Sequence, residues 1–96
     1  MLAISPTIQE YVNLKHRCKT DIVAVILETA VSGAVTKSKI YYRSFLTYSR
    51  LKGYMKLLID NGLIECFDYE DSRLYRTTDK GTSFLQAYKA IRELIG

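Results

Sequence analysis

Two short helical segments separated by a turn of only two residues constrain the fold of this chain most. Thr36 is placed to cap a helix over Lys37–Ser44, and Thr47 follows the turn at Phe45-Leu46. The helix that Thr47 begins should run to about Asn61 and stop at Gly62. Its expected buried face has the i, i+3, i+4, i+7 spacing of Leu51, Tyr54, Met55 and Leu58. Both helices therefore have defined starts, and the turn between them is tight.

A hairpin and further helices complete the pattern. Residues 63–69 and 73–77 are predicted strands joined by a turn at residues 70–72. Thr20 is the predicted N-cap of a helix that closes at Ser32-Gly33, and Thr78 and Asp79 begin a last helix. Pro6 favours a short helix over Thr7–Lys15. This order predicts a mainly α fold with a small β-hairpin, a winged helix-turn-helix with an additional C-terminal helix.

The 96 residues suffice for one domain with a modest core. We divide them into an N-terminal extension (1–18), the winged helix-turn-helix domain (19–78) and a C-terminal helix (79–96). The apolar stripe of the last helix is wider than a small domain is expected to cover, which predicts a homodimer interface. Its residues are Phe84, Leu85, Tyr88, Ile91 and Ile95.

Charge is segregated along the chain although the net charge is only +4. No acidic residue occurs between Glu28 and Asp60, and that interval contains Lys37, Lys39, Arg43, Arg50, Lys52 and Lys56. Acidic residues gather just beyond it, at Glu65, Asp68, Glu70 and Asp71. This segregation indicates a surface that meets a polyanion.

The second helix of a helix-turn-helix places its N-terminal part against base edges in the major groove of duplex DNA. In this chain that part comprises Tyr48, Ser49, Arg50, Lys52 and Gly53. Arg50 is the predicted guanine reader, whereas Lys37, Lys39, Arg43 and Lys56 are predicted to contact phosphates. Arg73 and Arg76 of the hairpin either touch a phosphate or pair with acidic residues across the hairpin.

The sequence also resembles a family of archaeal winged-helix DNA-binding proteins. The resemblance lies in Leu58-Ile59-Asp60-Asn61-Gly62-Leu63-Ile64 and in the following Tyr75-Arg76-Thr77-Thr78-Asp79-Lys80-Gly81 with Phe84-Leu85. It covers roughly residues 19–94, and Thr77 stands where the family has an apolar residue. The family contains transcriptional regulators and small chromatin proteins, so the resemblance implies DNA binding by a homodimer that dimerises through its last helix.

Other functions have less support in the sequence. His16 and Cys18 lack the third group that a catalytic pair needs, and zinc needs four ligands, so we expect no catalytic residue, metal or cofactor. Cys18 and Cys66 are expected to be reduced and partly buried, with a disulfide as the alternative. Tyr41 and Tyr54 are expected in the core, against the alternative that Tyr41-Tyr42 stacks on single-stranded bases.

We therefore expect a sequence-specific regulator that binds double-stranded DNA as a homodimer and is not an enzyme. The alternatives are a chromatin protein that binds DNA without sequence preference and a winged helix that binds a protein partner. No apolar run approaches the roughly 18 residues that span a bilayer, and the first residues do not form a signal peptide. We expect a cytoplasmic, nucleoid-associated protein with no membrane partner.

Overall fold

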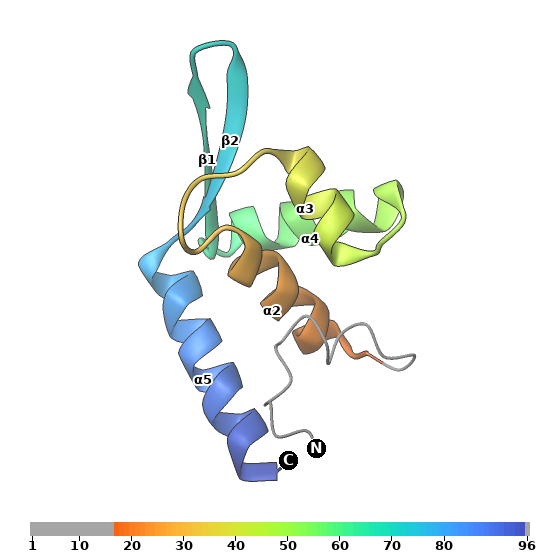
Figure 1. Cartoon of the computed structure of the whole chain (residues 1–96), viewed down its shortest axis with the longest axis vertical. Coiled ribbons are helices and arrows are strands. Elements are labelled where there is room, and N and C mark those ends of the chain that lie inside the picture. Colours follow the sequence, from red (N-terminus) through yellow and green to blue (C-terminus); the bar gives the residue numbers. More distant parts are fainter. Residues whose placement is uncertain (1–16, 96) are drawn as a thin grey trace.

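The computed structural model describes residues 17–95 (Figure 1). Along the chain its elements are α2 (Lys19–Thr29), α3 (Lys37–Ser44), α4 (Tyr48–Asp60), β1 (Ile64–Tyr69), β2 (Ser72–Thr77) and α5 (Asp79–Ile95). The predicted order of elements and the winged helix-turn-helix fold are confirmed. The helix expected over Thr7–Lys15 lies outside the described residues.

The helix starts follow the threonines at two of the predicted positions. The side chains of Thr36 and Thr47 accept hydrogen bonds from the backbone N–H groups of Lys39 and Arg50, each at 3.3 Å. The prediction that Thr20 caps α2 is wrong, because the helix begins two residues earlier, at Lys19, and Cys18 occupies the N-cap. The Asp21 carboxylate accepts a hydrogen bond from the Cys18 N–H at 3.0 Å. The capping acceptor is therefore a side chain of the first helical turn and not that of the N-cap residue.

Helix α2 lies at the centre of the domain, with α5 on one side and α3 and α4 on the other (Figure 1). Every residue from Asp21 to Leu27 is buried. The largest fully buried apolar side chains come from four elements and are Ile22, Val25, Ile26, Leu27, Ile40, Leu51, Leu58 and Ile64. Burying each of the larger ones contributes about 1.5–3 kcal/mol, so this cluster is what holds α3 and α4 in place.

The two tyrosines expected in the core differ in their surroundings. Tyr54 is half-buried and packs against the core cluster. Tyr41 is 36% exposed, so its placement in the core is wrong. The neighbouring Ile40 fills the core position of α3 with no exposed area, and the Tyr41 side chain lies at the edge of that face.

The hairpin is antiparallel, with a register that runs from Ile64 opposite Thr77 to Tyr69 opposite Ser72. Its base is tied to the loop before α3, because Val35 and Tyr75 exchange two backbone hydrogen bonds of 2.9 and 2.8 Å. Thr77 is buried, and its hydroxyl donates to the Leu27 carbonyl at 2.7 Å. The hydroxyl group of this buried threonine therefore has a hydrogen-bond partner in the last turn of α2.

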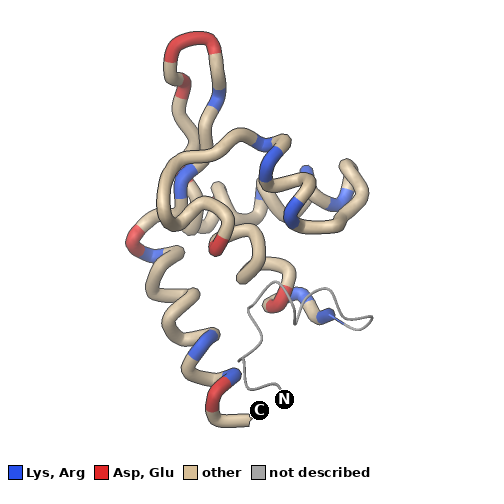
Figure 2. The backbone as a smooth tube through the Cα atoms, viewed as in Figure 1, with Lys and Arg blue, Asp and Glu red and all other residues tan. Residues whose placement is uncertain are grey.

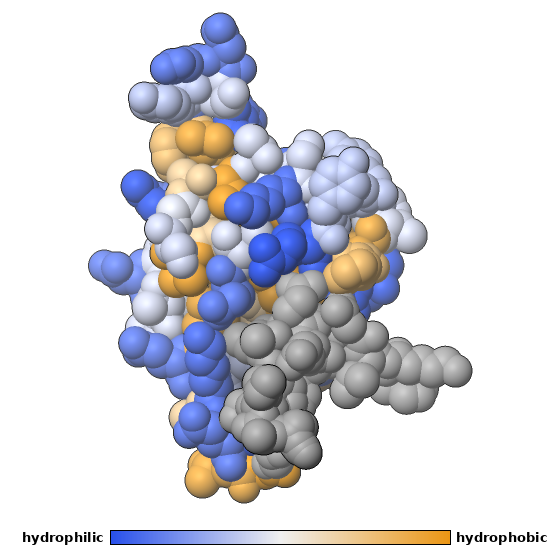
Figure 3. Space-filling model, viewed as in Figure 1, coloured by the Kyte–Doolittle hydropathy of each residue, from blue (hydrophilic) through white to orange (hydrophobic). Residues whose placement is uncertain are grey.

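The apolar stripe of α5 divides into two parts. Leu85 and Tyr88 are 3% and 8% exposed and belong to the core of the chain itself, with Phe84 packed against that core. Towards the end of the helix, Ile91, Leu94 and Ile95 are 56%, 84% and 76% exposed. Figure 3 shows this apolar group at the C-terminal end of α5. No helix within residues 17–95 combines the length and apolar character needed to cross a membrane.

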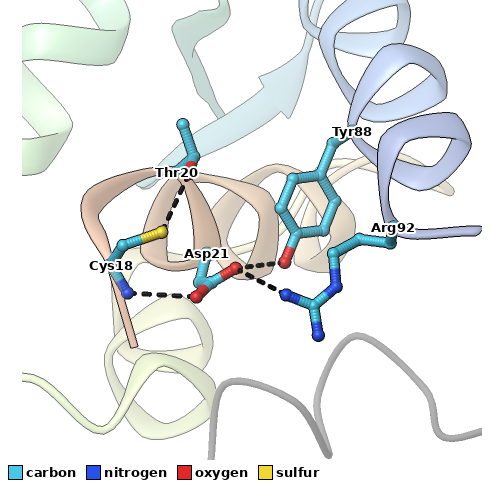
Figure 4. A network of polar contacts seen from close by, with 5 residues as sticks. All are labelled: Cys18, Thr20, Asp21, Tyr88 and Arg92. Atoms are coloured by element: carbon cyan, nitrogen blue, oxygen red, sulfur yellow. Dashed lines mark hydrogen bonds and ion pairs between the residues drawn. The ribbon is translucent and has the colours of Figure 1, made fainter. Parts of the chain in front are cut away.

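A polar network joins α5 to the start of α2 (Figure 4). Besides the Cys18 N–H, the Asp21 carboxylate accepts a short hydrogen bond from the Tyr88 hydroxyl and lies 3.6 Å from the Arg92 guanidinium. Burial alone would raise the pKa of Asp21, but the hydrogen bonds from Tyr88 and Cys18 and the charge of Arg92 outweigh it and lower that pKa. Burial and the bond to Asp21 raise the pKa of Tyr88, so its hydroxyl remains a donor.

We expect Asp21→Asn to lower the free energy of unfolding by about 1–2 kcal/mol at pH 7, because the ionised acceptor is lost. A carboxyl whose folded-state pKa lies below its unfolded value of about 3.9 stabilises the fold above that pH. This stabilisation is lost as the pH falls through the lowered pKa, so the difference between the variant and wild type should shrink as the pH falls below about 4. Urea unfolding at pH 7, 5 and 3 measures the difference. Asp68→Asn, whose side chain is 71% exposed, is the control, and a difference for Asp21→Asn that stays constant with pH would contradict the assignment.

Candidate nucleic-acid interface

Helices α3 and α4 form one face that is rich in cations. Figure 2 shows Lys and Arg along both helices, whereas acidic residues occupy the tip of the hairpin. The sequence of the two helices contains one acidic residue, Asp60, at the very end of α4. Lys39, Arg43, Arg50 and Lys52 are exposed, and Lys37 is half-buried. Because residues 29–59 contain no carboxylate, no acidic group of either helix opposes an anion over most of this face.

The first turn of α4 presents its side chains outward. The Thr47 cap fixes the start of the helix, and Tyr48, Ser49 and Arg50 follow it, all exposed. One turn further, a Cβ added to Gly53 would meet no atom within 4 Å. Packing inside the described chain therefore does not require glycine here, although a glycine in a helix interior costs about 1 kcal/mol relative to alanine.

Aromatic rings connect the two helices on this face. The ring centroids of Tyr41 and Tyr48 lie 6.3 Å apart at an interplanar angle of 66°. The ammonium groups of Lys37 and Lys52 lie over the Tyr48 ring, 5.8 and 5.9 Å from its centroid. The side chains of Lys37, Tyr41 and Lys52 thus surround the ring of Tyr48.

Arg17 is a further cation at this face that the pattern of elements did not predict. Its guanidinium donates to the carbonyl of Phe45 at 3.1 Å, in the turn between α3 and α4. Burial and then the charge of Arg50 are the main causes that lower the pKa of Arg17. One feature of the sequence points to it, because Arg17 lies in a second acid-free stretch, residues 11–20.

Three of the predicted DNA-binding cations have acidic partners within the chain. Lys56 lies 2.9 Å from Asp60 at the end of α4, and this hydrogen bond raises the pKa of Lys56. In the hairpin, Arg73 pairs with Asp68 at 3.1 Å and Arg76 with Glu65 at 2.7 Å. Of the two alternatives open for the hairpin arginines, the structure contains the cross-strand pairs.

The cysteines and the polar clusters give no second site. Cys18 and Cys66 are both exposed, so the expected partial burial is wrong. Within residues 17–95, no group of three His, Cys, Asp or Glu side chains is arranged to hold a metal ion. His16 lies outside the described residues.

Residues 16–96 match the winged helix-turn-helix family, and the chain belongs to that family. The resemblance inferred from the sequence is confirmed at this level. No curated protein sequence matches this chain.

Solved structures share the fold. The DNA-binding protein Sso10a-2 from Sulfolobus solfataricus has a TM-score of 0.69 at 21% identity, over 82% of this chain and 85% of its own. AF1382 from Archaeoglobus fulgidus has a TM-score of 0.66 at 19% identity, over 90% of this chain and 97% of its own. The transcriptional repressor BigR from Xylella fastidiosa has a TM-score of 0.60 at 16% identity, over 77% and 71% of the two chains.

Proposed function

We propose that this chain is a transcriptional regulator that binds double-stranded DNA sequence-specifically as a homodimer, with α4 in the major groove. The observation that carries the proposal is the exposed, acid-free face of α3 and α4, at which the capped start of α4 presents Tyr48, Ser49 and Arg50. The major groove, about 12 Å wide, accepts a helix. Similar structures described as a DNA-binding protein and a transcriptional repressor support the same reading.

The cations divide by position into two roles. Lys37, Lys39 and Arg43 on α3 contact phosphates, which orients the protein without reading sequence. Arg50 on the first turn of α4 reads a guanine through its two parallel N–H donors, assisted by Ser49 and Lys52. Gly53 allows close approach of the α4 backbone. Lys56, Arg73 and Arg76 contribute less, because each already has a carboxylate partner.

Replacing Arg50 tests the sequence-specific part of the proposal. A preferred duplex is first selected from a random pool by wild-type protein. Arg50→Ala should then bind that duplex about 5- to 150-fold more weakly, which corresponds to the loss of a bidentate base contact, and should bind unrelated duplexes nearly as well as wild type. Titration of both duplexes at one salt concentration measures the two affinities. Wild-type protein that binds all duplexes equally would instead identify a chromatin protein, and would contradict a regulator.

The exposed end of α5 carries the proposal of a homodimer. Ile91, Leu94 and Ile95 form an apolar group (Figure 3) at the end of α5, which projects from the domain (Figure 1), and a second copy of the chain would cover this group. A two-fold axis relating the two copies would allow each α4 helix to contact one half-site of a symmetric DNA duplex.

We expect the double variant Ile91→Glu and Ile95→Glu to be monomeric at micromolar concentration, with a mass of 11.0 kDa by light scattering, where wild type gives twice that mass. Charged side chains at both positions make burial of this surface unfavourable. Ser83→Glu with Gln86→Glu adds the same charge at exposed positions of α5 outside the apolar group and should remain dimeric. Monomeric wild-type protein would contradict the dimer.

A further inference from the structure

The tyrosine at the start of α4 has more defined surroundings than an exposed residue needs. Tyr48 is 55% exposed, yet its ring contacts groups from both helices of the motif. Lys37 and Tyr41 are four residues apart on α3, and Tyr48 and Lys52 are four apart on α4, so each pair shares one face of its helix. The two faces meet over the Tyr48 ring.

The contacts fix the orientation of this ring before any ligand arrives. Tyr41 packs edge-on at 66°, an arrangement that aromatic pairs favour. The ammonium groups of Lys37 and Lys52 are attracted to the ring face at 5.8 and 5.9 Å. Because cations lie over the ring, stacking on an unpaired base would displace them, whereas the 55% of Tyr48 that is exposed leaves part of the side chain available for a contact from the side. A side chain that is already ordered loses less conformational entropy on binding.

The position of the ring determines what its edge would meet. Tyr48 is the first residue of α4, next to Ser49 and Arg50. The positive charges of Lys37 and Lys52 lie beside its ring and would be attracted to DNA phosphates. The base edges of the major groove are polar except for one apolar group, the 5-methyl group of thymine. Contact with that methyl group removes apolar surface of both partners from water.

We propose that Tyr48 recognises a thymine methyl group in the major groove, and that Tyr41 is the positioning residue that holds the Tyr48 ring for this contact. The inference rests on the proposed function, since it needs a duplex bound against α4. It assigns a specificity role to Tyr41, which lies on the helix that otherwise supplies phosphate contacts.

Uracil substitution tests the contact, because it removes only the methyl group from the DNA. Each thymine of the selected duplex is replaced in turn, and affinities for wild type, Tyr48→Phe and Tyr48→Ala are measured. Wild type should lose about fourfold in affinity at one thymine of each half-site, the effect of one buried methyl group. Tyr48→Phe should keep this ratio, and Tyr48→Ala should bind the thymine and uracil duplexes equally.

Two further variants separate positioning by Tyr41 from a general structural role. Tyr41→Phe keeps the ring and should keep the thymine preference. Tyr41→Leu should reduce the preference while the salt dependence of binding stays as in wild type, because the phosphate contacts remain.

The outcomes distinguish this inference from the proposed function. If wild type binds the selected duplex but tolerates uracil at every position, or if Tyr48→Phe loses the preference, methyl recognition is wrong and DNA binding stands. If wild type retains no duplex, both fail.

Discussion

Gly81→Ala is expected to lower the free energy of unfolding by about 2–3 kcal/mol and the melting temperature by about 10–20 °C. Gly81 lies in the first turn of α5, where a Cβ would come within 2.4 Å of the Leu63 carbonyl oxygen and 2.6 Å of the Thr77 Cγ2. The Leu63 oxygen cannot easily move, because it accepts the Thr78 N–H at 3.1 Å. The added methyl group would push α5 away from the base of the hairpin.

Gly53→Ala is the matched control, because it makes the same substitution in another helix. No atom lies within 4 Å of its added Cβ, and alanine favours the helix, so stability should rise by about 1 kcal/mol. Thermal and urea unfolding of the two variants measure both effects. Equal stability changes would contradict the account of how α5 packs. If Gly53 allows close approach to DNA, the stabilised Gly53→Ala variant should also bind duplex more weakly than wild type.

The parts of the fold that depend on local chemistry could be predicted from the sequence. Thr36 and Thr47 cap their helices through bonds to residues three positions along, which sequence spacing reveals directly. Gly62 ends α4 with a φ of 73°, a conformation that glycine adopts without strain. The hairpin itself could also be predicted, but the turn expected over residues 70–72 is one residue too long, because Ser72 belongs to β2 and pairs with Tyr69.

Features that depend on contacts between distant residues could not be predicted in the same way. Arg17 reaches Phe45 across 28 positions of sequence, and Tyr88 reaches Asp21 across 67. Helical periodicity identified the apolar side of α5. It could not show how far along α5 the packing against the core extends, and therefore that the residues from Ile91 to Ile95 lie in the exposed part. The exposure of Tyr41 has the same cause, since periodicity does not distinguish the centre of a buried face from its edge.

The sequence predicted which cations belong to the candidate site, and the structure shows which of them form ion pairs with carboxylates of the same chain. Lys56, Arg73 and Arg76 share the charge of Lys39 but differ in having carboxylates at 2.7–3.1 Å. The carboxylate partners of the hairpin arginines come from the opposite strand, so only the register identifies them. This difference ranks Lys39 above these three cations as a phosphate contact.

The second large effect concerns the phosphate contacts. We expect Lys39→Ala with Arg43→Ala to weaken binding to every duplex, preferred or not, by roughly 60-fold at 0.1 M salt, because each lost phosphate contact removes about 0.9 from the slope of log affinity against log salt. The preference between duplexes should be unchanged, since these cations read no base. Lys80→Ala with Lys89→Ala removes the same charge from α5 and should leave the slope as in wild type. Similar melting temperatures verify that each double variant is folded.

The salt dependence of duplex binding by wild type and these two double variants tests the central claim most directly. Affinity is measured by fluorescence anisotropy of a labelled duplex from 50 to 300 mM salt. The account predicts a steep slope for wild type, a slope smaller by about two units for the α3 variant, and no change for the α5 variant. Wild-type protein that retains no duplex at the lowest salt, or equal slopes for the two variants, would contradict the assignment of α3 and α4 as a DNA-binding face.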